Sequence, residues 1–185
     1  MPKIRPARRS DLERVRHICI ETADERLKST PEKARITALL FADYYILHES
    51  HNCFVLEDEG EVVGYILCCT DVKKMCRHYT GDIFKQVASL SPLWGVACLF
   101  IPVKYVLYQK KYPAHLHIDI LEGWQSSGYG SKLMEQLLAH LKSQGVRGVC
   151  LSCGAKNIKA VNFYTKSGFE RILCAFGGLL MGRRP

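Results

Sequence analysis

A glycine-containing loop between an alternating strand and an amphipathic helix constrains this chain more than any other feature. Residues 115–120 alternate polar and apolar side chains, which predicts a strand with one polar face. The loop Gln125-Ser126-Ser127-Gly128-Tyr129-Gly130 follows, and residues 128–143 have apolar side chains at helical spacing, ended by Gly145. The first backbone N–H groups of a helix lack internal partners, and glycine lets a ligand approach the backbone. The loop therefore predicts an anion site at a helix start.

Two other phosphate-binding motifs fit this loop less well. The P-loop pattern G-x-x-x-x-G-K-[S/T] is absent from the sequence. A dinucleotide fingerprint needs a third glycine, and Leu133 stands where that glycine would be. A turn whose glycines serve only close packing stays an alternative.

The rest of the pattern predicts an α/β protein. Strands are expected at 3–5, 53–57, 62–69, 115–120, 149–153, 170–176 and 179–182, and helices at 11–22, from 31 to about 47, at 128–143 and at 159–167. Ser10 with Glu13 is expected to cap the first helix, and Thr30 before Pro31 the second. We expect one domain over 1–185: a mixed, partly antiparallel central sheet flanked by helices, with a helical insertion of one or two helices at about 70–113 that covers one mouth of the domain.

Composition limits the partners and the compartment. The net charge of +8 favours anionic ligands, but the basic residues are scattered and not interleaved with aromatics, so we do not expect nucleic acid. The nine cysteines lie mostly in apolar runs without zinc-site spacing, which predicts buried reduced thiols, no metal and a cytoplasmic protein, with a nuclear location left open. No secretory signal is visible. The apolar stretch 93–108 is shorter than the roughly 20 residues of a spanning helix, so a membrane partner is not expected, although interfacial attachment stays open.

Two motifs in the expected order resemble those of the GNAT superfamily of N-acetyltransferases. The run from His117 to Leu133, with Gln125-x-x-Gly128-x-Gly130, resembles its motif A. The run Asn157-x-x-Ala160-x-x-Phe163-Tyr164-x-Lys166-x-Gly168-Phe169 resembles its motif B, and Ile4-Arg5-Pro6-Ala7-x-x-x-Asp11-Leu12 its first strand and helix. A closer likeness, carried by residues 112–120 with Trp124 and Gln125, is to the acetyltransferase-like domain related to O-GlcNAcases. Some members of that subgroup do not bind acetyl-CoA, but the glycine loop is intact here.

The resemblance implies which residues hold acetyl-CoA. The pyrophosphate would be held by backbone amides of the segment that begins at Gln125. These amides belong to Ser126, Ser127, Gly128, Tyr129, Gly130 and Ser131. The backbone of Ile118 and Ile120 would pair with the pantetheine arm at an opened sheet edge. Asn157 would contact pantetheine, or cap the following helix, or do both. Tyr164 would lie beside the cofactor and protonate the leaving thiolate, unless it serves only core packing.

The polar face of the strand at 115–120 offers the remaining catalytic groups. Asp119 and His117 point to the same face, about 7 Å apart along the strand. We expect Asp119 to act as general base or amine-binding carboxylate, with His117 as its partner or the alternative base, and His115 as a third candidate. A hydrogen-bonded pair that only orders the strand is the alternative.

These expectations define a function with one rival. The chain is expected to be an acetyl-CoA-dependent N-acetyltransferase that passes the acetyl group directly to an amine of a protein or a small molecule. No cysteine has an activating histidine within sequence reach, so no acyl-enzyme is expected. The rival is a pseudo-acetyltransferase that binds a protein partner.

Overall fold

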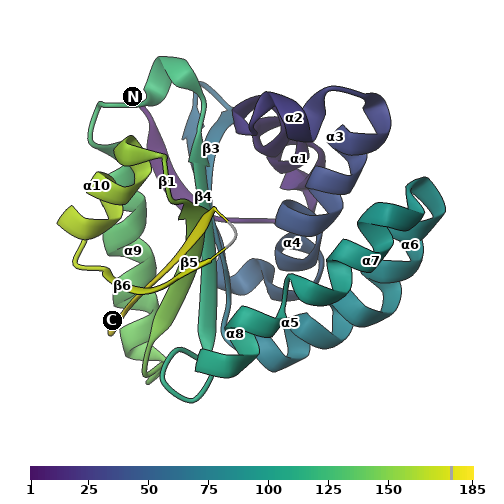
Figure 1. The fold of residues 1–185 in the computed structure, drawn as a ribbon. Helices are drawn as coiled ribbons and strands as arrows, with labels where there is room; N and C mark the ends of the chain where they lie inside the picture. Colours follow the sequence, from purple (N-terminus) through teal and green to yellow (C-terminus); the bar gives the residue numbers. More distant parts are fainter. Residues whose placement is uncertain (176) are drawn as a thin grey trace.

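The structure, a computed structural model, describes residues 1–175 and 177–185 and is built around one seven-stranded sheet (Figure 1). The strand order is β1-β2-β3-β4-β5-β7-β6. The strands are β1 (Lys3–Pro6), β2 (Phe54–Asp58), β3 (Glu61–Cys69), β4 (Ala114–Ile120), β5 (Val149–Gly154), β6 (Glu170–Ala175) and β7 (Gly178–Arg183). All described strand pairs are antiparallel except β4 with β5. The expected mixed α/β sheet is confirmed; the last residue of the predicted strand 170–176 lies outside the described residues.

Helices cover both faces of the sheet unequally. They are α1 (Leu12–Thr22), α2 (Glu25–Lys28), α3 (Pro31–Ala38), α4 (Tyr44–Glu49), α5 (Val72–His78), α6 (Phe84–Leu90), α7 (Pro92–Phe100), α8 (Val103–Tyr108), α9 (Tyr129–Ser143) and α10 (Ile158–Lys166). Figure 1 shows α9 and α10 on one side of the sheet and α1 to α8 on the other. The buried apolar residues accordingly form two clusters, one on each face.

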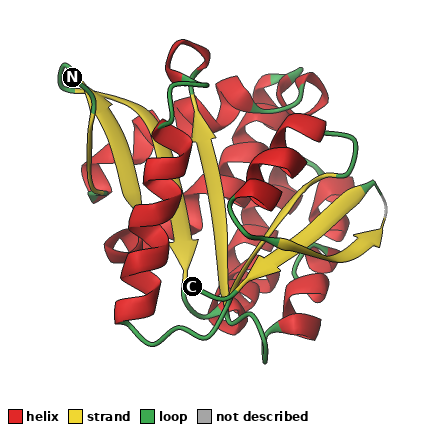
Figure 2. Cartoon of the chain, turned by 90° about the vertical axis from the view of Figure 1, so that its left-hand side faces the viewer, coloured by secondary structure: helices red, strands yellow, loops and turns green. Residues whose placement is uncertain are grey.

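The two central strands β4 and β5 separate along their length. Ala114 pairs with Val149 and His115 with Cys150, and the register between the two strands ends there. On its other edge β4 stays paired with β3 as far as Ile120. One edge of β4 is therefore free of strand pairing from Leu116 onward, toward the end of the strand that leads into the loop before α9. Figures 1 and 2 show strands of the sheet that lie close together at one end and apart at the other. The family resemblance implied an opened sheet edge at this place, and the register shows one.

Local signals predict most helix starts correctly, with one error. The Thr30 hydroxyl accepts a hydrogen bond from the N–H of Lys33 at 3.3 Å and Pro31 begins α3, as expected. Ser10, however, does not cap α1, because it lies inside a 3-10 turn at Arg9–Asp11. The Asp11 carboxylate instead accepts from the N–H of Arg8 at 2.7 Å. The expected Ser10–Glu13 capping box is therefore wrong, and the observed contact between Arg8 and Asp11 lies two residues earlier.

The insertion is more helical than its sequence indicates. It contains α5, α6, α7 and α8, with a π-helical turn at Tyr79–Ile83, where the sequence predicts one or two helices. The predicted second helix is likewise interrupted by a π-helical segment at Leu39–Asp43. No described helix is long and apolar enough to span a membrane.

Candidate functional site

The loop before α9 presents unpaired backbone donors. Gly128 is the N-cap of α9 and has φ of +80°, a left-handed conformation that other residues adopt only with strain. A Cβ at Gly128 would meet no atom within 4 Å, so this position is open to a ligand. None of the six N–H groups from Ser126 to Ser131 donates a hydrogen bond to any described part of the chain. Six free donors at the positive end of a 15-residue helix form an anion cradle.

The side chain of Gln125 fixes this loop. Its Nε2 donates to the carbonyl of Ile120 at 2.7 Å, at the end of β4. Its Oε1 accepts from Nζ of Lys159 at 2.8 Å, which ties the loop to α10. Trp124 adds a third anchor, because its indole N–H donates to Asp58 on β2 at 3.0 Å. Lys159 thereby brings a positive charge to the cradle, which no motif in the sequence indicates.

The two glycines of the loop serve different purposes. A Cβ at Gly130 would lie 3.3 Å from Cε2 of Phe163, closer than most real contacts of this kind. Gly130 therefore lets α9 approach α10, and the packing alternative holds for this glycine. Gly128 has no such neighbour, so its role is conformational and its surroundings are open. The other residues of the loop are exposed or half-buried, namely Ser126, Ser127, Tyr129 and Ser131.

The opened edge of β4 lies beside the cradle. Ile118 and Ile120 belong to the cluster that packs under α9 and α10, on the apolar face of the strand. Their backbone lies on the stretch of β4 that has no pairing with β5. The carbonyl of Ile120 already accepts one hydrogen bond from Gln125, which leaves the Ile118 stretch as the freer part of the edge.

Asn157 and Tyr164 lie on α10, across the opening. The Asn157 side chain caps this helix, since its Oδ1 accepts from the N–H of Ala160 at 3.0 Å. The capping interpretation is thus confirmed, and the pantetheine contact stays a prediction. Tyr164 is buried, with Phe163 and Phe169 against its ring. Burial raises the pKa of its phenol, and the Asp119 carboxylate and Cys153 raise it further, so the hydroxyl keeps its proton.

The polar face of β4 forms a connected group with β3. Tyr65 lies directly opposite Asp119 in the β3–β4 register, and its hydroxyl donates to Oδ2 of Asp119 at 2.6 Å. Nε2 of His117 lies 2.9 Å from the same oxygen. The two atoms are in ion-pair range, although the ring N–H is not aligned for a hydrogen bond. The expected pair of Asp119 and His117 therefore exists, and Oδ1 of Asp119 has no hydrogen-bond partner among the described residues.

The two histidines of this face have different charges. Burial alone would lower the pKa of His117, but the Asp119 carboxylate outweighs it and raises the pKa to about 10. His117 is therefore a cation at neutral pH and not a free base. His115 is buried, and burial holds its pKa well below the usual value, so it is neutral. Its Nδ1 lies 2.7 Å from the hydroxyl of Tyr45, which places it in the core beneath the cleft.

Sequence reasoning misses three neighbours of this group. Ligand atoms of Cys19, His117 and Asp119 all lie within 4.8 Å of one another, although the sequence pattern places Cys19 only in the core of the first helix. Phe41 stacks on His117 at 5.6 Å between ring centroids, and Tyr65 reaches Asp119. These three side chains come from α1, from the segment after α3 and from β3. No local sequence signal marks them, because only the tertiary fold brings them together.

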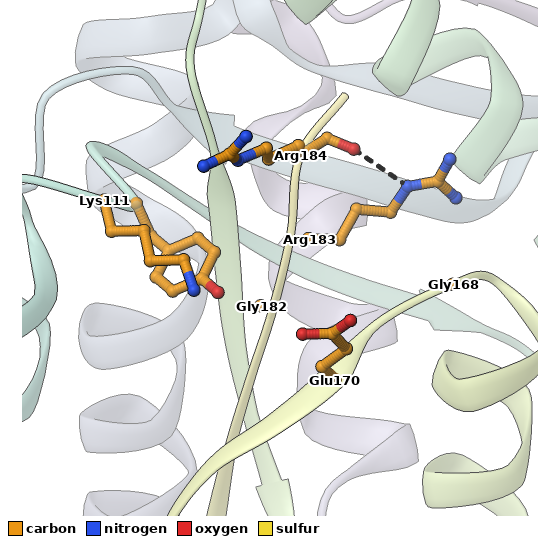
Figure 3. A pocket seen from close by; sticks show the side chains of 7 residues that line it. Lys111, Gly168, Glu170, Gly182, Arg183 and Arg184 are labelled. Atoms are coloured by element: carbon orange, nitrogen blue, oxygen red, sulfur yellow. Dashed lines mark hydrogen bonds between the residues drawn. The ribbon is translucent and has the colours of Figure 1, made fainter.

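A separate pocket lies away from this group, at the start of β4. It is lined by Lys111, Tyr112, Gly168, Glu170, Gly182, Arg183 and Arg184 (Figure 3). Figure 3 shows Arg183 turned away from Lys111, with its Nε donating to the Arg184 carbonyl at 3.1 Å. Glu170 is the one acidic residue among those that line this pocket, and none of the predicted site residues lines it.

The opened edge of β4 and the free amides at the start of α9 define a protein whose central sheet can hold an anionic ligand between β4 and α10. The chain matches the model of the Acetyltransferase (GNAT) family over residues 13–169. It therefore belongs to the GNAT family of acetyltransferases. The closer likeness to the O-GlcNAcase domains stays a prediction.

Solved structures share the fold over the whole chain. The structure of SsHAT superimposes with a TM-score of 0.87 at 34% identity, covering 99% of this chain and 98% of that one. The PaiA N-acetyltransferase from Thermoplasma acidophilum, in complex with coenzyme A, gives a TM-score of 0.65 at 14% identity. The superposition covers 100% of this chain and 99% of that one. A Drosophila melanogaster polyamine N-acetyltransferase, which forms N-acetylagmatine, gives a TM-score of 0.57 at 14% sequence identity, and the superposition covers 100% of each chain. At these lower identities the likeness concerns the fold.

Proposed function

We propose that this chain is an acetyl-CoA-dependent N-acetyltransferase that passes the acetyl group directly to an amine. The observation that carries the proposal is the row of six free amides from Ser126 to Ser131, at the start of α9 and beside the unpaired edge of β4. A pyrophosphate is an anion of the right size and charge for such a row. Lys159, held at the loop by Gln125, adds an exposed positive charge.

The remaining parts of the cleft suit the rest of the cofactor. The free backbone edge around Ile118 can add an extended amide-containing arm as if it were a strand. When bound, acetyl-CoA supplies an activated thioester, so the protein needs to supply only position and proton transfer. Tyr164, on the far side of the opening, holds a proton on its phenol at neutral pH and is our candidate to protonate the leaving thiolate.

Asp119 is the group that we assign to the acceptor amine. Its Oδ2 is occupied by Tyr65 and His117, and its Oδ1 is free to take a proton or orient an ammonium group. Because His117 is already protonated, we assign it to holding the Asp119 side chain in place through their ion pair, and no longer as the alternative base. The acceptor is an amine of a small molecule or of a protein.

Calorimetry with acetyl-CoA tests the cradle, and the helix itself offers the matched control. Gly128 and Gly145 lie at opposite ends of α9, both with positive φ, and at both a Cβ would meet no atom within 4 Å. Gly128→Val and Gly145→Val therefore carry the same backbone strain. We expect Gly128→Val to weaken acetyl-CoA binding about tenfold or more and Gly145→Val to leave it unchanged. Absence of binding by the unaltered protein at millimolar cofactor would favour a binding module and end the enzyme proposal.

A further inference from the structure

The insertion carries a concentrated apolar surface. Of the ten large hydrophobic residues that are exposed in the described chain, eight lie between residues 90 and 107. We call these eight the α7–α8 apolar surface; they are Leu90, Leu93, Val96, Leu99, Phe100, Val103, Val106 and Leu107. Leu93, Phe100 and Leu107 are 79%, 71% and 70% exposed. Contiguous exposure of this kind marks an interaction site rather than scattered surface residues.

The helices that bear this surface are firmly packed from beneath. Cys98 is fully buried and Tyr105 nearly so, on the inner faces of α7 and α8. Gly95 lets α7 approach α6 closely, since a Cβ there would lie 2.7 Å from Cβ of Ala88. The orientation of both helices is therefore set by the core. The outward side chains are exposed, so core packing does not explain why they are apolar.

Most of the charges around the surface have one sign. Between Lys85 and Lys110 the single charged residue is Lys104, and its ammonium group turns inward and donates to Oγ of Ser152 at 2.7 Å. The outer face thus has no charge over 24 positions. Exposed basic residues border it at Lys85, Lys110 and Lys111. Lys73 and Arg77 line a groove together with members of the surface itself.

Acidic residues are nearly absent from this part of the chain. From Val72 to Ile118 the sequence has seven lysines and arginines and one acidic residue, Asp82. A second copy of the chain fits such a surface poorly, because an isologous contact would bring two basic borders together. A negatively charged partner fits it well. A bilayer with anionic headgroups provides both the apolar layer and the negative charge.

We propose that the α7–α8 apolar surface docks this protein on an anionic membrane. The helices lie in the interface with Leu93, Phe100 and Leu107 inserted among the acyl chains, while the basic border contacts the headgroups. No described helix spans the bilayer, so the attachment is peripheral. The inner faces of α7 and α8 stay on the core, where Tyr105 packs against His115 of β4. This attachment does not depend on the proposed acetyltransferase function, and it would place the protein at a membrane surface.

Co-sedimentation with lipid vesicles tests the proposal. We expect the protein to sediment with vesicles of phosphatidylcholine containing about one-quarter phosphatidylserine and to stay in solution with phosphatidylcholine alone. Raising the salt from about 0.1 M to about 0.5 M should weaken binding, because it screens the basic border. The variant Leu93→Glu/Phe100→Glu/Leu107→Glu should bind at least about tenfold more weakly. The variant Lys73→Gln/Arg77→Gln/Lys110→Gln should still bind these vesicles, but more weakly than the unaltered protein and with a smaller dependence on salt.

Charge and folding are controlled separately. Lys142→Glu/Arg147→Glu changes the net charge by −4, against −3 for the apolar variant, at exposed positions of α9 and the turn after it. This control should keep most of the vesicle binding, and every variant should keep its helical circular dichroism. Equal binding by the apolar variant, or equal binding to uncharged vesicles, would overturn the proposal. A dimer in light scattering that the apolar variant abolishes, without vesicle binding, would assign the surface to a second copy instead.

Discussion

His117 and Asp119 face each other on one side of β4, with Nε2 of the histidine 2.9 Å from Oδ2 of the aspartate. Successive side chains on one face of a strand are usually about 7 Å apart, so both side chains lean together. Tyr65 holds the aspartate from the neighbouring strand. The result is a carboxylate with a cation on one side, a phenol on the other and one free oxygen.

The pair should make stability depend on alkaline pH. The pKa of His117 is raised from its ordinary value near 6.5 to about 10 by Asp119. A raised pKa in the folded protein contributes stability that is fully present below about pH 6.5 and is lost as the pH rises toward 10. Urea unfolding at pH 6, 8 and 10 should therefore show a progressive loss that is smaller in Asp119→Asn. Identical pH profiles for the two proteins would contradict the ion pair.

Removing the carboxylate should affect turnover more than cofactor binding. Asp119→Asn keeps the shape of the side chain but loses the charge, and we expect kcat to fall about 10²-fold or more. The acetyl-CoA affinity should change little, since the cradle lies at the other end of the loop. Asp82→Asn, an exposed carboxylate in the insertion, is the control and should keep full activity. An active Asp119→Asn would remove this residue from the proton transfer.

The local sequence pattern predicts the loop before α9 and the two faces of β4. The other neighbours of the site come together only through tertiary contacts. Gly128 is identifiable because a left-handed N-cap needs glycine, and β4 because its two faces differ in polarity. The ion pair is expected from spacing along one strand. Tyr65 is not, because its position opposite Asp119 depends on the register of β3 with β4. Cys19 and Phe41 lie on helices whose docking angle no local pattern specifies. The insertion is least predictable, because its outward face is as apolar as its inward face.

The contact between Lys104 and Ser152 should respond asymmetrically to mutation. Burial lowers the pKa of Lys104, and Oγ of Ser152 accepts its hydrogen bond at 2.7 Å. Ser152→Ala leaves a half-buried ammonium without this partner, which should destabilise the protein by about 1–3 kcal/mol. Lys104→Met removes the charge and keeps the apolar stem, so it should cost less or even stabilise. Urea denaturation of the two single variants measures the difference, and a larger loss for Lys104→Met would contradict it.

Thiol reactivity should identify one cysteine. All nine cysteines are free, and seven of them are buried. Burial raises the pKa of Cys53, Cys68 and Cys69, so these thiols are protonated and shielded at neutral pH. Cys174 on β6 is exposed. We expect one fast phase in labelling with a disulfide reagent, which Cys174→Ser removes and Cys53→Ser does not.

Tyr164→Phe should separate chemistry from binding. If the phenol protonates the leaving thiolate, its loss should lower kcat by about 10²–10⁴-fold, and acetyl-CoA affinity should stay within a few-fold because the ring and its contacts with Phe163 and Phe169 remain. Tyr112→Phe is the matched control, since it removes the hydroxyl of another buried tyrosine that lines the pocket at the opposite end of β4. Rates measured from about pH 7 to about pH 10 add a second criterion: because burial raises the pKa of the Tyr164 phenol, the unaltered enzyme should lose no activity over this range through deprotonation of Tyr164. Equal kcat values for Tyr164→Phe and Tyr112→Phe would assign Tyr164 to core packing alone.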